Sequence, residues 1–380
     1  LEQFIDPEAD EPPLDDVEDV EVALYPVSEQ HDDDGEYIET TIGEAVDDSI
    51  ITSPWVAYFL GVAQGWYERV GVDMDRFRFR QHLSGERAHY AADCWDAESE
   101  IGGNWIEIAG FAYRGDYDLT KHGEHSEDRF TVFKRYDEPK TVERATVDPD
   151  MAALGPEFGG AAGDVADALQ ELAEHDPDAF DGDEVIVDID GESYTVDTDV
   201  ANFSVEEQTE NGEHITPHVV EPSFGIGRTV YTLLEHAYSE DEVDDETRTY
   251  LSLAPEIAPT DVAVFPLVSN DDALIDVASD LADELRAAGI SVSYDDSGSI
   301  GRRYRRQDEV GTPFCVTVDQ DGLEGDDQTT VTVRERDSAA QLRLPVADLA
   351  VELEAIFDGD HEFADLQDRY DRVDTDVTTD

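Results

Sequence analysis

The chain has 380 residues, enough for two or three domains, and its formal charge of −72 comes from 96 acidic against 24 basic residues. The acidic residues are spread over the whole length, whereas a surface for basic partners would be local. The spread therefore favours adaptation to concentrated salt, because the Debye length falls to about 3 Å near 1 M and the self-repulsion is screened. The two distant cysteines exclude a disulfide scaffold and suggest a cytoplasmic location, and neither an apolar run of about 18 residues nor a signal peptide is found.

The first 122 residues predict one well-marked helix. Residues 6–48 are acidic with scattered apolar positions and predict only a hairpin or a loop excursion. Ser53 and Pro54 then supply an N-cap and a first helical residue, and Gly71 supplies an end. Between them, large apolar side chains recur at helical spacing: Trp55, Phe59, Val62 and Trp66. Two strands are expected after the helix: residues 77–80, where Phe and Arg alternate, and residues 105–109.

Residues 123–212 are richly acidic and are predicted to form an insertion or subdomain between two pieces of one core. The spacing of Val165, Leu169 and Leu172 predicts a helix in it. Two segments, EVIVDI and ESYTVD, flank the Asp-Gly pair at 190–191, which favours a tight turn. They therefore predict a β-hairpin.

Pro255 and Pro259 mark a boundary, beyond which strands and helices alternate. Strands and helices are expected in turn at these residues: strands 262–268, 290–296, 314–319 and 329–336, and helices 272–289 and 345–357. The pattern predicts an α/β domain at residues 259–358, which is a usual size of about 100 residues. Residues 359–380 are predicted to form an acidic, frayed tail.

One segment, PHVVEPSFGIGR at residues 217–228, ends a predicted strand and opens an amphipathic stretch. Its two glycines let a ligand approach the backbone, a helix N-terminus attracts anions, and the guanidinium of Arg228 suits phosphate oxygens. Glu221 and Ser223 face the same side of a strand and suit an ammonium group. The alternative is a helix start with close-packed glycines and a surface arginine. Spacing alone favours this alternative, because G-x-G-R is a weak pattern.

A second segment, NWIEIAGFAYRGDYDLTKH at residues 104–122, places Glu107 between two isoleucines. In a strand, the carboxylate of Glu107 points away from the face of the two isoleucines. A carboxylate on the polar side of a buried sheet is costly unless a cation or a hydrogen-bond donor accompanies it. A Mg²⁺-nucleotide or an amine would serve. The alternative, favoured for this segment taken alone, is a structural pair with Arg114.

A third segment, SIGRRYRRQDEVGTPF at residues 299–314, holds the only strong basic cluster: Arg302, Arg303, Tyr304, Arg305 and Arg306. Arginines around an aromatic ring suit phosphate contact and base stacking. The alternative is a solvated helix face that neutralises neighbouring acids. Against a charge of −72, nucleic-acid binding is the favoured interpretation.

Other patterns predict no site. His82, His89 and Cys94 lack the spacing of a metal site, and His214 and His218 are expected to flank a strand. Neither HDDDGEY nor DIDGES has the twelve-residue calcium-loop pattern, and the P-loop and Rossmann glycine patterns are missing. No metal site built from protein ligands alone is therefore predicted.

Four stretches together resemble the archaeal or eukaryotic-type glycyl-tRNA synthetases, a family of class II aminoacyl-tRNA synthetases: FRFRQHLSGERAHYAADCWDAE, NWIEIAGFAYRGDYDL, PHVVEPSFGIGRTVYTLLEH and SIGRRYRRQDEVGTPF. The resemblance implies an α/β fold class. It implies an α+β catalytic domain with an antiparallel sheet at residues 1–258, interrupted by the acidic insertion at 123–212. An α/β anticodon-binding domain is implied at residues 259–358.

The same resemblance implies activation of glycine by ATP with Mg²⁺, and transfer of the glycyl group to the 3′ end of tRNA(Gly), by a cytoplasmic homodimer. Arg228 and Glu107 are the implied catalytic residues. The implied ATP contacts are Glu107, Ile108, Gly225, Ile226, Gly227 and Arg228. The implied glycine contacts are Glu221, Pro222, Ser223, Phe224 and Gly225. The basic cluster at residues 302–306 is the implied tRNA contact.

The family's first two motifs, a dimer-interface segment and a strand with a phosphate-binding arginine, are expected before Leu1. The chain is therefore expected to be an N-terminally truncated fragment. Two alternatives stay open. One is a non-catalytic, synthetase-like nucleic-acid-binding protein, against which the intact Glu107, Glu221, Ser223 and Arg228 argue. The other is a class II synthetase for proline, threonine or histidine.

Overall fold

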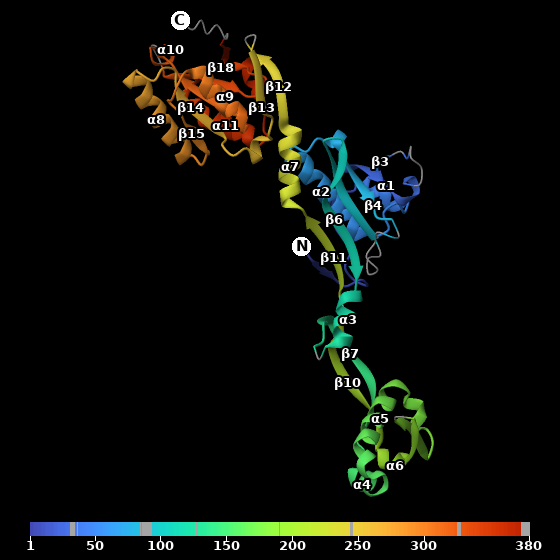
Figure 1. Ribbon diagram of the computed structural model, residues 1–380. Coiled ribbons are helices and arrows are strands. Elements are labelled where there is room, and N and C mark those ends of the chain that lie inside the picture. Colours follow the sequence, from blue (N-terminus) through green and yellow to red (C-terminus); the bar gives the residue numbers. More distant parts are fainter. Residues whose placement is uncertain are drawn as a thin grey trace. The chain divides into compact units, whose positions relative to one another are not determined.

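The computed structural model describes residues 1–30, 35, 37–83, 85, 93–126, 128–189, 191–243, 246–324 and 328–373 (Figure 1). The chain divides into two compact units, one made of Leu1–Gly115 and His218–Asp380 and the other of Asp116–Pro217. Both contain helices and strands, so the predicted α/β class is confirmed. His89, the Asp190 position of the predicted turn and the end of the predicted tail lie outside the described residues.

A seven-stranded sheet forms the first part of the larger unit. Its strands lie in the spatial order β1 (Gln3–Ile5), β11 (His218–Phe224), β6 (Asn104–Gly115), β5 (Asp93–Ile101), β4 (Phe77–Gln81), β2 (Glu21–Tyr25) and β3 (Ile38–Thr41). The neighbours are antiparallel, except that β2 and β4 are parallel. Residues 6–48, expected to be a hairpin or loop, supply two of these strands and the short helix α1 (Ile42–Asp47). The sequence pattern did not predict β5.

Helix α2 (Pro54–Arg69) packs against this sheet (Figure 1). Its predicted ends are confirmed, because the Ser53 hydroxyl accepts a hydrogen bond from the Val56 amide and Gly71 has a φ of +90°. The apolar residues whose spacing predicted the helix are not its most buried ones, since Val62 is 43% and Trp66 39% exposed. A second stripe with the same helical spacing faces the sheet instead: Val56, Leu60, Ala63 and Tyr67. Periodicity alone cannot choose between two apolar stripes on one helix.

One helix and a β-hairpin connect the seven-stranded sheet to the second half of the larger unit, which begins at β14 (Val262–Pro266). Helix α7 (Ile226–Ala237) follows β11, and β12 (Tyr238–Val243) follows α7 without an intervening residue. β12 pairs with β13 (Glu246–Leu251) as an antiparallel hairpin that the sequence pattern did not predict. Apolar side chains of α7 are largely exposed to solvent, including Ile226, Val230 and Tyr231, because its inward side makes mainly polar contacts.

A six-stranded sheet follows. Its strands lie in the spatial order β15 (Val292–Tyr294), β14 (Val262–Pro266), β16 (Phe314–Val318), β17 (Thr330–Glu335), β18 (Gln341–Pro345) and β19 (Asp371–Arg372). The first three are parallel and the others are antiparallel. The helices are α8 (Asp272–Ala287), α9 (Ile300–Val310), α10 (Gln320–Leu323) and α11 (Val346–Phe357). All the elements expected in residues 262–357 are present, and α9, α10 and β18 are additions.

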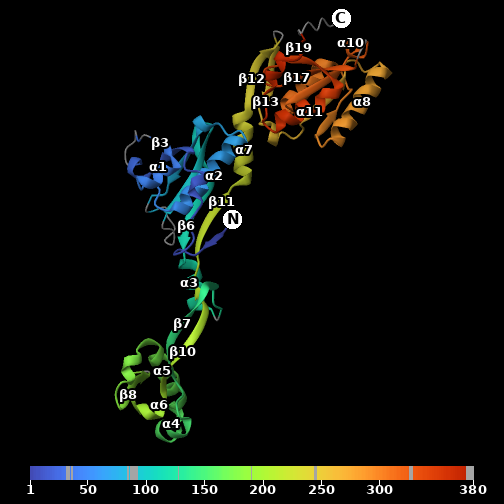
Figure 2. The same ribbon diagram turned by 180° about the vertical axis from the view of Figure 1, so that it is seen from behind.

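The two faces of this sheet carry different helices. Val262 and Val264 of β14 pack in the same core as α8 and α11, which Figure 2 shows beside the strands. Ala263 and Phe265, which alternate with them, pack instead against Tyr304 of α9. Successive side chains of a strand point to opposite faces, so α9 covers the other side of the sheet.

The smaller unit has its own core. Its elements are α3 (Tyr117–His125), β7 (Val132–Val147), α4 (Met151–Phe158), α5 (Ala162–His175), β8 (Glu184–Ile189), β9 (Glu192–Asp197), α6 (Thr198–Ala201) and β10 (Phe203–Ile215). β7 pairs with β10 in a long antiparallel ribbon. α5 confirms the helix predicted around Val165 and Leu169, which are both buried, and β8 and β9 confirm the two hairpin strands. Among the described residues of the whole chain, none of the helices has the length and apolar character to cross a bilayer.

Candidate active site

The pairing of β6 with β11 brings together the two segments singled out at residues 104–122 and 217–228. Glu221 lies opposite Ala112, and Ser223 lies opposite Gly110. Directly opposed residues of antiparallel strands project from the same face. Glu221 and Ser223 therefore share one face of the sheet with two small residues of β6, Ala112 and Gly110.

Strand β5 extends this polar face on the other side of β6. Asp96 lies opposite Gly110, and beyond a change of register Glu98 lies opposite Glu107. A Cβ atom added at Gly110 would lie 3.5 Å from the Asp96 carboxylate, so the side chains of β5 reach over the middle strand. The face thus has carboxylates on both sides of the small residues Gly110 and Ala112.

Two ion pairs connect the segments. The Arg228 guanidinium donates to the Glu107 carbonyl at 2.8 Å and lies 3.4 Å from its carboxylate, and about half of each side chain is exposed. Arg114 pairs with Glu221 at 2.8 Å and is more enclosed. The suggested structural pair of Glu107 with Arg114 is therefore wrong: each residue is paired across the two segments instead. The exposed pair is the one that a ligand can open at lower cost.

The start of α7 lies very close to β6. The Gly225 amide donates to the Ile108 carbonyl at 2.8 Å, and a Cβ atom at Gly225 would lie only 3.0 Å from that oxygen. A side chain at position 225 would therefore crowd that carbonyl. Gly227 faces open space, and Ile226 is 65% exposed. The unpaired N–H groups of the first helical turn thus lie beside Glu107, next to open solvent.

Three other predicted contacts do not present their side chains on this face: Pro222, Phe224 and Ile108. Pro222 alternates with Glu221 and Ser223 and lies opposite Phe111, so its side chain is on the other face. The ring of Phe224 lies 5.7 Å from that of Phe111, among the rings of the helix α2 side of the sheet. Ile108 is buried.

The polar face also holds a buried arginine, Arg78, that the sequence pattern did not single out. Arg78 of β4 donates to the Glu98 carboxylate at 2.8 Å. Its guanidinium carbon lies 4.1 Å from the ring centre of Trp105, with the rings of Tyr25 and Tyr37 at 4.8 and 5.2 Å. The alternation in FRFR and WDAESE is the signal that could have found it, because it puts Arg78, Asp96 and Glu98 on one face.

His82 is an ion-pair partner. Its Nε2 lies 2.7 Å from the Asp96 carboxylate. The hydrogen bond to Asp96, reinforced by one to Cys94, raises the pKa of His82 to about 10, against the opposing effect of burial. His218 is likewise engaged, with Nδ1 2.5 Å from the Tyr113 hydroxyl. Within the part of the chain that the structure describes, no three His, Cys, Asp or Glu side chains are grouped to hold a metal ion.

The basic cluster lies on α9, and most of its side chains contact other groups of the chain. Arg303 is buried and donates to Ser269 and to the Gly298 carbonyl, both at 2.9 Å, and burial lowers its pKa. Tyr304 packs on Phe265 and contacts the Thr317 hydroxyl. Arg306 pairs with Asp295. Arg302 is exposed, and Arg305 is partly so, 4.0 Å from Asp308. Direct contact with RNA is thus sterically open to Arg302, Arg305 and Arg306, and closed to Arg303 and Tyr304.

The second half of the larger unit matches a known family model. Residues 261–356 match the family model described as an anticodon binding domain. This range contains β14 to α11, so the match covers the six-stranded sheet up to β18 and all four of its helices.

Relatives cover most of the chain. It is 45% identical over 356 residues to a glycine–tRNA ligase of Methanothrix thermoacetophila, covering 93% of this chain and 60% of the relative. A glycine–tRNA ligase of Methanothermobacter thermautotrophicus is 41% identical, covering 93% of this chain and 61% of that protein. One of Methanocaldococcus jannaschii is 41% identical, covering 92% and 61%. The chain thus spans about three fifths of the length of these curated relatives.

Proposed function

We propose that this chain, which belongs to the glycine–tRNA ligase family, is the part of such an enzyme that binds glycine and ATP and delivers the glycyl group to tRNA(Gly). One observation carries the proposal. The β6–β11 register puts Glu221 and Ser223 on the same face as small residues of β6, and the ion pair of Arg228 with Glu107 lies at the end of that pairing. An ammonium-binding group and a phosphate-binding group are thereby joined in one continuous surface.

The first chemical step is attack of the glycine carboxylate oxygen on the α-phosphorus of ATP, which releases pyrophosphate and forms glycyl-adenylate. Arg228, freed from Glu107, holds phosphate oxygens with its planar guanidinium. Glu107 then faces the Mg²⁺ that accompanies ATP as substrate. Positioning and charge neutralisation supply most of the rate, and no covalent enzyme intermediate is needed.

The glycine ammonium lies against Glu221, with Ser223 as a second acceptor. Arg114 pairs with Glu221 at 2.8 Å and fixes the direction of its carboxylate. Selectivity for glycine comes from excluding a methyl group, because a missing methylene alone is worth only ~1–3 kcal/mol. In the second step, a hydroxyl at the 3′ end of the tRNA attacks the glycyl carbonyl and AMP leaves.

The proposal also assigns a role to each region of the chain. Residues 1–258 form the catalytic region, with an acidic insertion at about 123–212, and residues 259–358 bind the anticodon arm, followed by an acidic tail. Arg302, Arg305 and Arg306 are the members of the basic cluster whose side chains are at least partly exposed, and they are proposed to contact RNA phosphates. The complete enzyme is proposed to be a cytoplasmic homodimer.

Amino-acid-dependent exchange of pyrophosphate into ATP tests this function. The complete protein that contains this chain is assayed in molar KCl with glycine, alanine, proline, threonine and histidine. Exchange with glycine only is expected. Exchange with proline, threonine or histidine would assign the protein to another class II specificity. Binding of tRNA without exchange for any amino acid would identify a non-catalytic relative.

A further inference from the structure

The hairpin of residues 238–251, made of β12 and β13, joins α7 directly to the six-stranded sheet and its helices. The Ser252 amide donates to the Ala237 carbonyl at 2.7 Å, which closes the base of the hairpin onto the last turn of α7. That turn is also tied to the first sheet, because Glu235 pairs with Arg76 and the His236 ring lies 3.2 Å from the Ser99 hydroxyl. The hairpin therefore continues directly, with no intervening residue, from the helix that begins beside Glu107.

Arg248, in the middle of β13, holds the far side of this hairpin. It is 0% exposed. Its guanidinium makes a bidentate ion pair with Asp241 of the same hairpin, with Nε donating to Oδ1 at 2.8 Å. The other N–H groups donate to the carbonyls of Arg336 and Asp337, just after β17, at 2.5 and 3.1 Å. Its guanidinium carbon also lies 4.2 Å from the ring centre of Tyr250.

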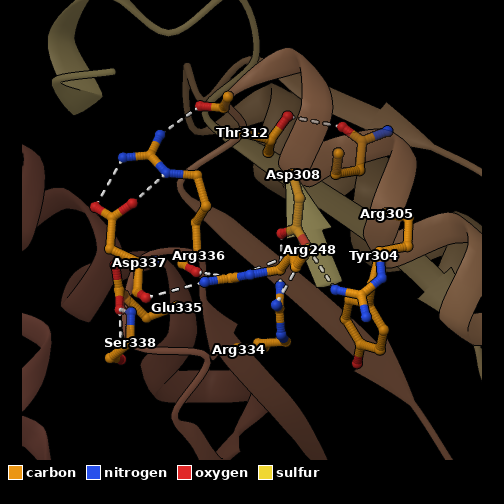
Figure 3. A network of polar contacts seen from close by, with 12 residues as sticks. Arg248, Tyr304, Arg305, Asp308, Thr312, Arg334, Glu335, Arg336, Asp337 and Ser338 are labelled. Atoms are coloured by element: carbon orange, nitrogen blue, oxygen red, sulfur yellow. Dashed lines mark hydrogen bonds and ion pairs between the residues drawn. The ribbon is translucent and has the colours of Figure 1, made fainter. Parts of the chain in front are cut away.

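The same cluster reaches the helix that carries the basic residues. Asp308 of α9 is buried, accepts two hydrogen bonds from Arg334 at 2.8 and 3.2 Å, and lies 3.8 Å from Arg248 (Figure 3). Arg336 donates to the carbonyls of Gly311 and Leu253 at 2.7 and 2.8 Å. Three buried arginines, Arg248, Arg334 and Arg336, therefore join the hairpin to the chain that follows it, to α9 and to β17.

Such a cluster is better suited to fixing a geometry than to adding stability. Taking charges out of water is costly, and a well-packed apolar group is often at least as stabilising as a buried ion pair. Three of the 24 basic residues of a very acidic chain are nevertheless placed here, where they cannot offset surface charge. The directional bonds of Arg248 to two carbonyls and to the Asp241 carboxylate, with Asp308 at 3.8 Å, define one position of the hairpin against α9.

We propose that Arg248 is a positioning residue for the transfer of glycine to tRNA. This inference rests on the proposed function. By fixing the hairpin to α9, Arg248 sets the path between the tRNA-binding helix and α7, and so aligns the 3′ end of bound tRNA with the adenylate. A misplacement of ~1 Å far from the chemistry can cost about a hundredfold in rate. Formation of the adenylate, which needs no tRNA, does not depend on this alignment.

The test compares the two steps in the complete protein. For Arg248→Met we expect glycine-dependent exchange within about twofold of the unaltered protein, and at least a tenfold fall in kcat for tRNA charging. The KM for tRNA changes less than threefold, because the exposed arginines of α9 are intact. Arg248→Lys recovers part of the loss. The matched control is Arg286→Met, which removes an exposed arginine paired with Asp283 on α8 and leaves both steps unchanged.

Three results would overturn the inference: equal losses in exchange and charging, no loss of charging in a folded Arg248→Met protein, or a loss confined to KM. Should Arg248→Met fail to fold, Asp241→Asn gives the second measurement, since it keeps the shape of a partner that is one third exposed. It is expected to show the same split in weaker form. Unfolding of both variants would assign the cluster to stability alone. Lack of exchange by the unaltered protein would count against the proposed function itself.

Discussion

At the scale of single residues, the proposed activity depends on an exposed ion pair that a substrate can open. Arg228 and Glu107 come from opposite ends of two separate segments, and each side chain is about half exposed. An exposed ion pair is worth about 0–1 kcal/mol, so ATP phosphates and Mg²⁺ can replace it at little cost. The pair therefore keeps both groups in place without obstructing the substrate.

Replacing Arg228 tests this role. We expect Arg228→Ala to lower kcat/KM for glycine-dependent exchange by about 10²–10³-fold, because a positioned cation at the phosphates is lost. Thermal unfolding should be unchanged, since the side chain is largely solvent-exposed. Arg69→Ala, which opens another exposed pair with a glutamate, is the control. Near-normal exchange by the Arg228 variant would remove this residue from the site.

The His82–Asp96 pair predicts a pH-dependent contribution to stability. The folded state raises the pKa of His82 to about 10 from 6.5, chiefly through the hydrogen bond to Asp96. A raised pKa means that the stabilisation is complete below about 6.5 and is lost as the pH rises towards 10. The difference in unfolding free energy between the unaltered protein and His82→Gln should therefore shrink from pH 6 to pH 10. Urea unfolding at constant KCl measures it, and a difference that grows with pH would contradict the assignment.

At the scale of elements, the sequence predicts periodic segments well and their orientation poorly. The caps of α2 are local signals, so Ser53 and Gly71 were correct, whereas its two apolar stripes cannot be ranked without the sheet. The geometry of the candidate site could likewise be predicted only where it depends on local spacing. Alternation puts Glu221 and Ser223 on one face, but the partners Arg228–Glu107 and Arg114–Glu221 depend on the β6–β11 register. The register joins residues more than 100 positions apart.

The end of α9 offers a test of how tightly the hairpin region is packed. Gly311 has a φ of +83°, and an added Cβ atom would lie 2.8 Å from Cδ1 of Leu253 and 3.1 Å from the Leu251 carbonyl. We expect Gly311→Ala to lower the unfolding free energy by about 1–3 kcal/mol, from backbone strain and overlap. Gly301→Ala, where nothing lies within 4 Å, should be neutral or stabilising by up to ~1 kcal/mol. Equal effects of both substitutions in denaturant unfolding would refute this packing.

At the scale of the whole molecule, the charge of −72 affects the proposed binding of tRNA, which is itself a polyanion. Binding to RNA usually weakens as salt rises, through counterion release. Here the general repulsion between two polyanions opposes a few local arginine contacts, and salt screens the repulsion. We expect tRNA charging to increase from low salt to molar KCl, measured at fixed Mg²⁺. An optimum near 0.1 M would contradict adaptation to concentrated salt.

We propose that one polar face, formed by β5, β6 and β11 and completed by the start of α7, binds glycine beside ATP. A crystal structure of the complete protein with a non-hydrolysable glycyl-adenylate analogue tests it most directly. We predict that the glycyl ammonium lies against Glu221 and Ser223, and that the phosphate contacts Arg228, which has left Glu107. An analogue that binds in solution but occupies another surface, with the Arg228–Glu107 pair intact, would contradict the claim.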